Sequence, residues 1–219
     1  MDPITIGIGI VILVTAAVSA AVRHYNNKVK RANEALDKLA KVLGQYADAY
    51  LFEDCDKVVI NEVKQYTKRL RAKGKLSEIM QSMNLKDRKD YISKVVCEIA
   101  FIMKVELSDI NIIDLGPYTF GQSYVDDGKY KMDLNEVVLI ADPDRLLQTV
   151  CHELRHLQQM QSLSDDKWGF SNNRKAQWIL AFNNYVQADS DSEIQYTAYV
   201  MQSIEIDANK FAYEVTGEG

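Results

Sequence analysis

The chain has few of the residues that interrupt helices or cross-link loops. Its 219 residues include only 3 Pro, 10 Gly and 3 Cys. Because Pro and Gly are the strongest breakers of regular structure, their scarcity favours a largely helical domain. The cysteines Cys55, Cys97 and Cys151 are odd in number and show no C-x-x-C spacing, so reduced thiols in a cytosolic domain are the simplest interpretation. The sequence contains no internal repeat or low-complexity tract.

The chain also lacks the excess of basic residues that a dedicated nucleic-acid-binding protein carries. Its formal net charge is −5 at pH 7, and we therefore expect no nucleic-acid partner. A short basic cluster over residues 68–75 is interpreted as a solvated helix end.

Histidine is scarce as well, and two of the three histidines lie in one short motif. Residues 152–156 read H-E-x-x-H, the pattern of the zinc helix of metalloproteases. On a helix, His152 and His156 share a face, so both imidazoles can bind one ion. Glu153 can act as the general base toward a metal-bound water. The alternative is a chance match on a surface helix with two solvated histidines.

The residues around the motif predict an amphipathic helix. Asp142, Pro143 and Asp144 are typical of a helix start. Apolar side chains then recur at helical spacing on the face opposite both histidines: Leu146, Leu147, Val150, Cys151, Leu154 and Leu157. One face can therefore pack on a core while the other presents the imidazoles, and Cys151 is expected to be a buried thiol rather than a ligand.

A catalytic zinc ion takes three protein ligands and keeps its fourth position for water. No histidine follows His156, so a carboxylate must complete the set. A helix predicted over residues 196–212 places Glu205 on one face with Ala198, Gln202, Asn209 and Ala212. The small alanines permit a close helix approach, and Glu205 is therefore favoured as the third ligand.

Other carboxylates remain alternatives to Glu205, namely Asp191, Glu193, Asp207 and Glu214. Asp207 points about 160° away from Glu205 on the same helix, so the two cannot bind one ion together. Asn209 lies one turn beyond Glu205, and we expect its side chain to hydrogen-bond a ligating imidazole.

The segments around both motifs, LLQTVCHELRHLQQ and EIDANKFA, resemble gluzincin-type metallopeptidases, and in particular the ImmA/IrrE-like group of bacterial and phage-related peptidases. The resemblance covers roughly residues 108–216. It implies a zincin-like fold that holds Zn²⁺ through His152, His156 and Glu205, with Glu153 as catalytic base. Asn209 stands where related enzymes often have an Asp that orients a ligand. A donor to the oxyanion is also needed, and Tyr196 and Tyr199 are candidates because they precede Glu205 closely.

Three strand-like runs precede the motif helix, at residues 110–115, 118–125 and 130–134. They are rich in aromatic and β-branched residues, and Asp127-Gly128 predicts a hairpin turn between the last two. We expect a small antiparallel sheet. In the families that the chain resembles, an edge strand pairs with extended substrate, which makes Tyr118–Val125 and Tyr130–Leu134 candidates for that edge. The alternative is a purely structural sheet.

Residues 4–22 form the one long uncharged run, and its nineteen residues are enough to cross a bilayer as a helix. Only Asp2 precedes this run, whereas Arg23, Lys28, Lys30 and Arg31 follow it. The positive-inside rule therefore predicts a single-pass anchor with the rest of the chain in the cytoplasm. A cleaved signal peptide is the alternative, although a basic start is missing.

The expected fold class is α+β and mainly helical. We expect an N-terminal transmembrane anchor with its basic flank at residues 1–31, a helical region at 32–107, and a zincin-like metallopeptidase domain at 108–219. The predicted function is a membrane-anchored zinc metallopeptidase with a protein or peptide substrate. The alternative is a membrane-tethered interaction protein in which the same fold binds zinc structurally or not at all.

Overall fold

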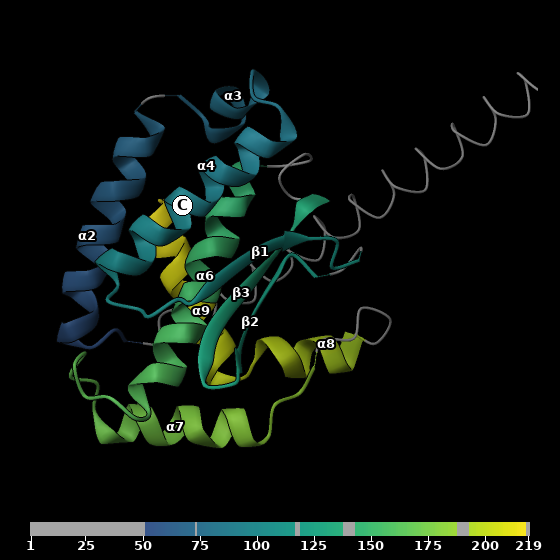
Figure 1. Cartoon of the computed structure of the whole chain (residues 1–219). Coiled ribbons are helices and arrows are strands. Elements are labelled where there is room, and N and C mark those ends of the chain that lie inside the picture. Colours follow the sequence, from purple (N-terminus) through teal and green to yellow (C-terminus); the bar gives the residue numbers. More distant parts are fainter. Residues whose placement is uncertain (1–50, 73, 117–118, 138–142, 188–192, 218–219) are drawn as a thin grey trace, which may run out of the picture. The chain divides into compact units, whose positions relative to one another are not determined.

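The computed structural model describes residues 51–72, 74–116, 119–137, 143–187 and 193–217. They belong to one compact unit (Figure 1). This unit consists of helices and one three-stranded sheet, which confirms the predicted mainly helical α+β class. The predicted anchor at residues 4–22 lies outside the described residues. None of the helices within the described ranges is both long and apolar enough to cross a bilayer.

Three helices come first: α2 (Asp54–Arg71), α3 (Leu76–Gln81) and α4 (Leu85–Ile102). A capping box between Glu53 and Asp56 begins α2, and the side chain of Asn84 accepts a hydrogen bond from the backbone N–H of Asp87 to begin α4. Their apolar faces join the same hydrophobic core as the C-terminal helices, with Ile99 and Phe211 both fully buried. One hydrophobic core therefore includes residues of both the predicted helical region at 32–107 and the predicted domain at 108–219.

The sheet contains β1 (Asp109–Ile113), β2 (Gly121–Asp126) and β3 (Lys129–Asn135), in the order β1-β3-β2. Asp127 and Gly128 join β2 to β3 with positive φ angles of 49° and 72°, which confirms the predicted hairpin turn. The expectation of an all-antiparallel sheet is wrong, because β1 pairs with β3 in parallel.

Because β3 is the central strand, only β1 and β2 of the three described strands have a free edge that could pair with a substrate segment. Met132 and Leu134 of β3 are fully buried, so the core favours β3 between the other two strands. The candidate edge Tyr130–Leu134 is therefore wrong. The run Tyr118–Val125 overlaps β2, which is an edge strand and contacts α6 (Figure 1).

The motif helix is α6 (Pro143–Ser162), and it begins at Pro143 as predicted, although Asp142 lies outside the described residues. Every residue of the predicted apolar face is at most 4% exposed, which confirms that face. The polar face is buried as well, including Arg155, Gln158 and Gln159, because α6 contacts helices and the sheet together. The helix is thus central to the core and does not lie on the surface.

The C-terminal helices are α7 (Asn172–Asn183), α8 (Glu193–Val200) and α9 (Ser203–Thr216). The single helix predicted over residues 196–212 is wrong, because the chain becomes extended at Gln202, the N-cap of α9. The side-chain amide of Gln202 accepts a hydrogen bond from the backbone N–H of Val186 and donates one to its carbonyl, both at 2.9 Å. These bonds fix the break, and they place Glu205 in the first turn of α9, where the helix dipole favours an anion.

Candidate metal centre

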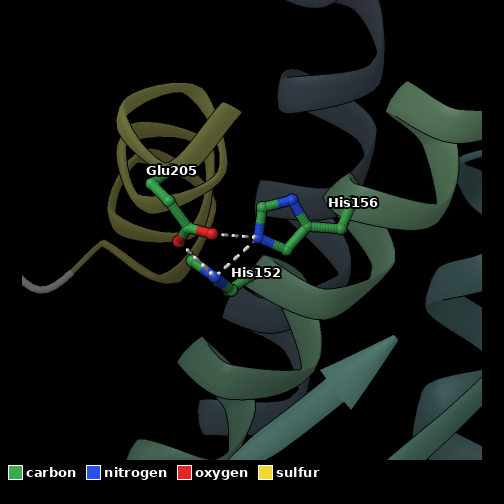
Figure 2. Close-up of side chains that lie close together, drawn as sticks. All are labelled: His152, His156 and Glu205. Atoms are coloured by element: carbon green, nitrogen blue, oxygen red, sulfur yellow. Dashed lines mark hydrogen bonds and ion pairs between the residues drawn. The ribbon is translucent and has the colours of Figure 1, made fainter. Parts of the chain in front are cut away.

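Helices α6 and α9 bring together the three residues nominated as metal ligands. His152 and His156 lie one turn apart on α6, and Glu205 faces them from α9 (Figure 2). The two Nε2 atoms are 2.9 Å apart. Oε2 of Glu205 lies 3.4 Å from Nε2 of His152, and Oε1 lies 3.4 Å from Nε2 of His156. One ligand atom from each residue thus falls within 4.8 Å of the others.

These separations are close to those of a tetrahedral zinc site. With bonds of about 2.0–2.1 Å from zinc to its ligands, two ligand atoms at the tetrahedral angle lie about 3.3 Å apart. Both nitrogen–oxygen distances of 3.4 Å are close to this value, and each involves a different oxygen of Glu205. The nitrogen–nitrogen distance of 2.9 Å is that of a hydrogen bond, so one Nε2 carries a proton in this arrangement.

The charges at the centre require a cation. Glu205 is 1% exposed, and its Oε2 finds no hydrogen-bond donor among the described residues. Burial favours a higher pKa for Glu205, but the charge of His156 and the close approach of both imidazoles outweigh it and lower the pKa. Burial likewise opposes the charged form of His156, yet Glu205 raises its pKa to about 9. A proton or a metal ion can supply the positive charge that this buried carboxylate needs.

Glu153 points toward strand β2 and stays outside the group of three ligands. It is 6% exposed, and its Oε2 accepts a hydrogen bond of 2.8 Å from the hydroxyl of Ser123. Gly121 allows β2 to approach so closely, because a Cβ there would lie 2.9 Å from Cγ of Glu153 and from Cγ2 of Thr149. Sequence reasoning missed Ser123 and Gly121, since only the packing of β2 on α6 brings them to the motif.

A tyrosine that sequence reasoning did not nominate reaches the centre most directly. Tyr185, in the loop after α7, donates a hydrogen bond of 3.1 Å to Oε1 of Glu205. The nominated Tyr196 and Tyr199 pack beside it, with ring centroids 6.3 Å apart and Tyr199 6.1 Å from Tyr185, and Tyr199 also interacts with Glu205. Burial, followed by the charge of Glu205, raises the pKa of both Tyr196 and Tyr199. These phenols therefore stay protonated and can donate hydrogen bonds at neutral pH.

The predicted role of Asn209 is taken by another residue. Within the described part of the chain no hydrogen bond links Asn209 to either imidazole, and Nδ1 of His156 lies 2.9 Å from Oε1 of Gln159 instead. Gln159 stands one turn after His156 on α6, a spacing visible in the sequence as H-x-x-Q. The sequence therefore contained this spacing. Whether Gln159 or Asn209 contacts His156 depends on how α9 is rotated against α6.

The alternative ligands have other partners where the structure describes them. Asp207 forms a buried ion pair with Arg155, and Glu214 pairs with Lys64 at the surface at 2.7 Å. The side chain of Glu193 and all of Asp191 lie outside the described residues. Cys151 is fully buried, and burial raises the pKa of its thiol to about 12, so it remains a protonated core residue as expected.

The arrangement brings together three kinds of group that metal-assisted hydrolysis uses. Three ligand atoms converge, a carboxylate stands beside them on the same helix, and a phenol hydroxyl donates into the same space. No protein-family model, curated protein or solved structure matches this chain.

Proposed function

We propose that the protein is a zinc-dependent metallopeptidase with His152, His156 and Glu205 as zinc ligands. The observation that carries the proposal is the convergence of two imidazole nitrogens on a buried carboxylate within an H-E-x-x-H helix. Structural zinc sites use four protein ligands, whereas catalytic sites use three. The group found among the described residues has three.

Access to solvent supports catalysis over a structural role. The side chains of His152 and His156 are 15% and 10% exposed, so part of each imidazole ligand is at the protein surface. An interaction protein with a structural zinc site would instead need a closed fourth position. The resemblance to gluzincin-type and ImmA/IrrE-like peptidases agrees with the catalytic role.

Each group at the centre is assigned one role in peptide hydrolysis. Zinc at the centre would polarise a peptide carbonyl and lower the pKa of a water molecule. Glu153 would accept the proton of that water and pass it to the leaving amine. Because Ser123 bonds Oε2 of Glu153, Oε1 is the oxygen assigned to proton transfer. Ser123 thereby holds the general base in one orientation.

Tyr185 is our candidate for the donor that stabilises the oxyanion, in place of Tyr196 and Tyr199. Its hydroxyl already lies 3.1 Å from an oxygen of Glu205. Two hydrogen bonds between the side-chain amide of Gln202 and the backbone of Val186 hold its loop in place. Donors that are placed in advance in this way contribute much of the rate enhancement in acyl transfer.

The substrate we propose is an extended segment of a protein or peptide. Edge strand β2 lies beside α6 and can pair with such a segment through its backbone. The ImmA/IrrE-like resemblance suggests a regulatory protein such as a repressor, by analogy. From the uncharged run at residues 4–22 and its basic flank, we also propose a single-pass anchor with the catalytic unit in the cytoplasm.

The test is made on the full chain, purified in detergent with zinc supplied and without chelators. We expect about one zinc ion per chain by elemental mass spectrometry. Glu153→Gln should keep the zinc and lower cleavage of a fluorogenic peptide library by about 10²- to 10⁴-fold, the usual contribution of a general base.

The matched control is Glu62→Gln, at an exposed position of α2, which should leave zinc content and cleavage unchanged. Absence of zinc from the wild-type protein contradicts the proposal. So does a Glu153→Gln protein that holds zinc and cleaves as fast as the wild type.

A further inference from the structure

Gln159 is a fully buried amide whose orientation is determined by its partners. Its Nε2 donates to Oδ2 of Asp207 at 2.6 Å and to the carbonyl of Ile204 at 3.1 Å. Both partners are pure acceptors, so the NH₂ group must face them. The carbonyl oxygen of Gln159 therefore faces His156, where it lies 2.9 Å from Nδ1.

This orientation determines which nitrogen of His156 binds a metal. A carbonyl oxygen can only accept, so Nδ1 of His156 must carry a proton and donate it to Gln159. A neutral imidazole with a proton on Nδ1 leaves the lone pair on Nε2. That nitrogen faces Glu205 and His152.

Behind Gln159 lies a cluster of four buried charges, Asp56, Arg155, Arg174 and Asp207, which we call the ion cluster. Arg155 donates from Nε and Nη2 to the two oxygens of Asp207, at 2.8 and 2.9 Å, and from Nη2 to Asp56 at 2.6 Å. Nη1 of Arg174 lies 3.5 Å from Asp207 and 3.7 Å from Asp56. Two cations thus balance two anions in the core.

The ion cluster is held rigidly by elements from both halves of the chain. Asp56 belongs to α2, Arg155 to α6, Arg174 to α7 and Asp207 to α9. The guanidinium carbon of Arg155 lies 5.1 Å from the ring centroids of both Phe170 and Phe211. Asp207 is therefore a fixed acceptor, and Gln159 joins it to the metal centre by hydrogen bonds.

We propose that Gln159 is a positioning residue that holds His156 with Nδ1 protonated and Nε2 directed at the metal, and that the ion cluster fixes Gln159 through Asp207. This inference rests on the proposed zinc site. Partners of this kind raise metal affinity by orienting a ligand before the ion arrives.

Gln158 provides a matched control for Gln159. Both are fully buried glutamines on α6, and both bond to the ion cluster. Gln158 accepts from Nη1 of Arg155 at 2.7 Å and does not bond to either imidazole. We compare Gln159→Met with Gln158→Met in the full chain, because methionine keeps the length of glutamine and removes its amide.

The measurement is zinc affinity by competition with a fluorescent chelator, with zinc alone as the probe. Gln159→Met should weaken zinc binding by about 10- to 100-fold, the usual effect of losing such a partner. Gln158→Met should bind zinc within about 3-fold of the wild type, because it breaks a bond of the ion cluster and leaves His156 untouched. Equal losses in both variants, or wild-type affinity in Gln159→Met, would overturn the inference.

A rescue variant separates orientation from packing. In Gln159→Glu, a protonated carboxyl group can accept from His156 and donate to Asp207, so zinc affinity should exceed that of Gln159→Met by about 10-fold. A Gln159→Glu affinity no higher than that of Gln159→Met contradicts the assigned hydrogen bond.

If Gln159→Met does not fold, the wild-type protein still tests the inference. In zinc-loaded protein with ¹⁵N-labelled histidine, NMR should show His156 coordinated through Nε2, with a slowly exchanging proton on Nδ1. Coordination through Nδ1, or a rapidly exchanging Nδ1 proton, overturns the assignment. If the wild-type chain binds no zinc, the proposed function and the inference both fail. If it binds zinc through Nδ1 of His156, only the inference fails, so the two failures are distinguishable.

Discussion

Two groups of buried charged residues both include members from helices α6 and α9, and they differ in how their charges are satisfied. The ion cluster contains Arg155 of α6 and Asp207 of α9, and the candidate metal centre contains His156 of α6 and Glu205 of α9. In the ion cluster each carboxylate faces a guanidinium, and Arg155 and Asp207 are fully buried. In the metal centre the carboxylate faces two imidazoles, and Oε2 finds no hydrogen-bond donor among the described residues.

This difference teaches how to separate a structural polar core from a ligand site. Charges that neutralise each other with complete hydrogen bonding gain nothing from a further ion. Three converging atoms that can all act as acceptors are stabilised only when a proton or a metal ion joins them. Burial alone does not distinguish the two groups, because Glu205 and Asp207 are 1% and 0% exposed.

The largest effect on folding should follow from breaking the ion cluster. Arg155→Met leaves Asp56 and Asp207 without their main cation, so we expect the free energy of unfolding of the zinc-free protein to fall by about 3–5 kcal/mol. Urea denaturation followed by tryptophan fluorescence measures the change. Arg69→Met, at an exposed position of α2, is the control and should have little effect. A loss below about 1 kcal/mol would mean that the ion cluster does not hold the core together.

A substitution in the candidate metal centre should weaken zinc binding strongly and change folding stability little. Glu205→Gln removes a ligand and should weaken zinc binding by at least about 100-fold. His156 can then lose its proton and leave no buried charge. The free energy of unfolding of the zinc-free protein should therefore change by only about 1 kcal/mol. Glu214→Gln, on the same helix, should leave zinc affinity unchanged, because that residue pairs with Lys64 at the surface. Wild-type zinc affinity in Glu205→Gln would remove the distinction between the two groups.

Loss of a hydroxyl group near Glu205 should affect turnover alone and leave folding and zinc binding intact. Tyr185→Phe should keep zinc and lower the turnover of the peptide library by roughly 10²-fold, as expected for the loss of one oxyanion donor. Tyr196→Phe should change turnover by no more than about 3-fold, because Tyr196 packs against the ring of Tyr199, with centroids 6.3 Å apart. Equal losses in the two variants would show that the tyrosines act as a packed group rather than through one hydroxyl.

Much of the site could be predicted because its signals are local. The spacing of His152 and His156 already places both on one helical face, and the apolar residues opposite them already predict which face is buried. The turn at Asp127-Gly128 follows from the residues that accept a positive φ. The prediction of Glu205 rested on Ala198 and Ala212; Ala212 is buried in α9, whereas Ala198 is exposed on α8.

The errors arose where distant segments meet. The helix predicted through residue 202 breaks because Gln202 bonds to Val186 of the preceding loop, and helical periodicity does not register such a bond. The parallel pairing of β1 with β3 reflects the competition of three strands for the central position. Tyr185 was missed because only that folded loop brings it to Glu205.

The sequence by itself determined that two histidines and a glutamate share one helix, and that a second helix carries a carboxylate able to join them. Periodicity and spacing are sufficient for this, since they depend on neighbours within a few turns. Only the tertiary structure decided which partners orient those residues: Gln159 and the ion cluster behind His156, Ser123 beside Glu153, and Tyr185 against Glu205. These partners come from elements far apart in the chain, and packing around the shared core determines which of them meet.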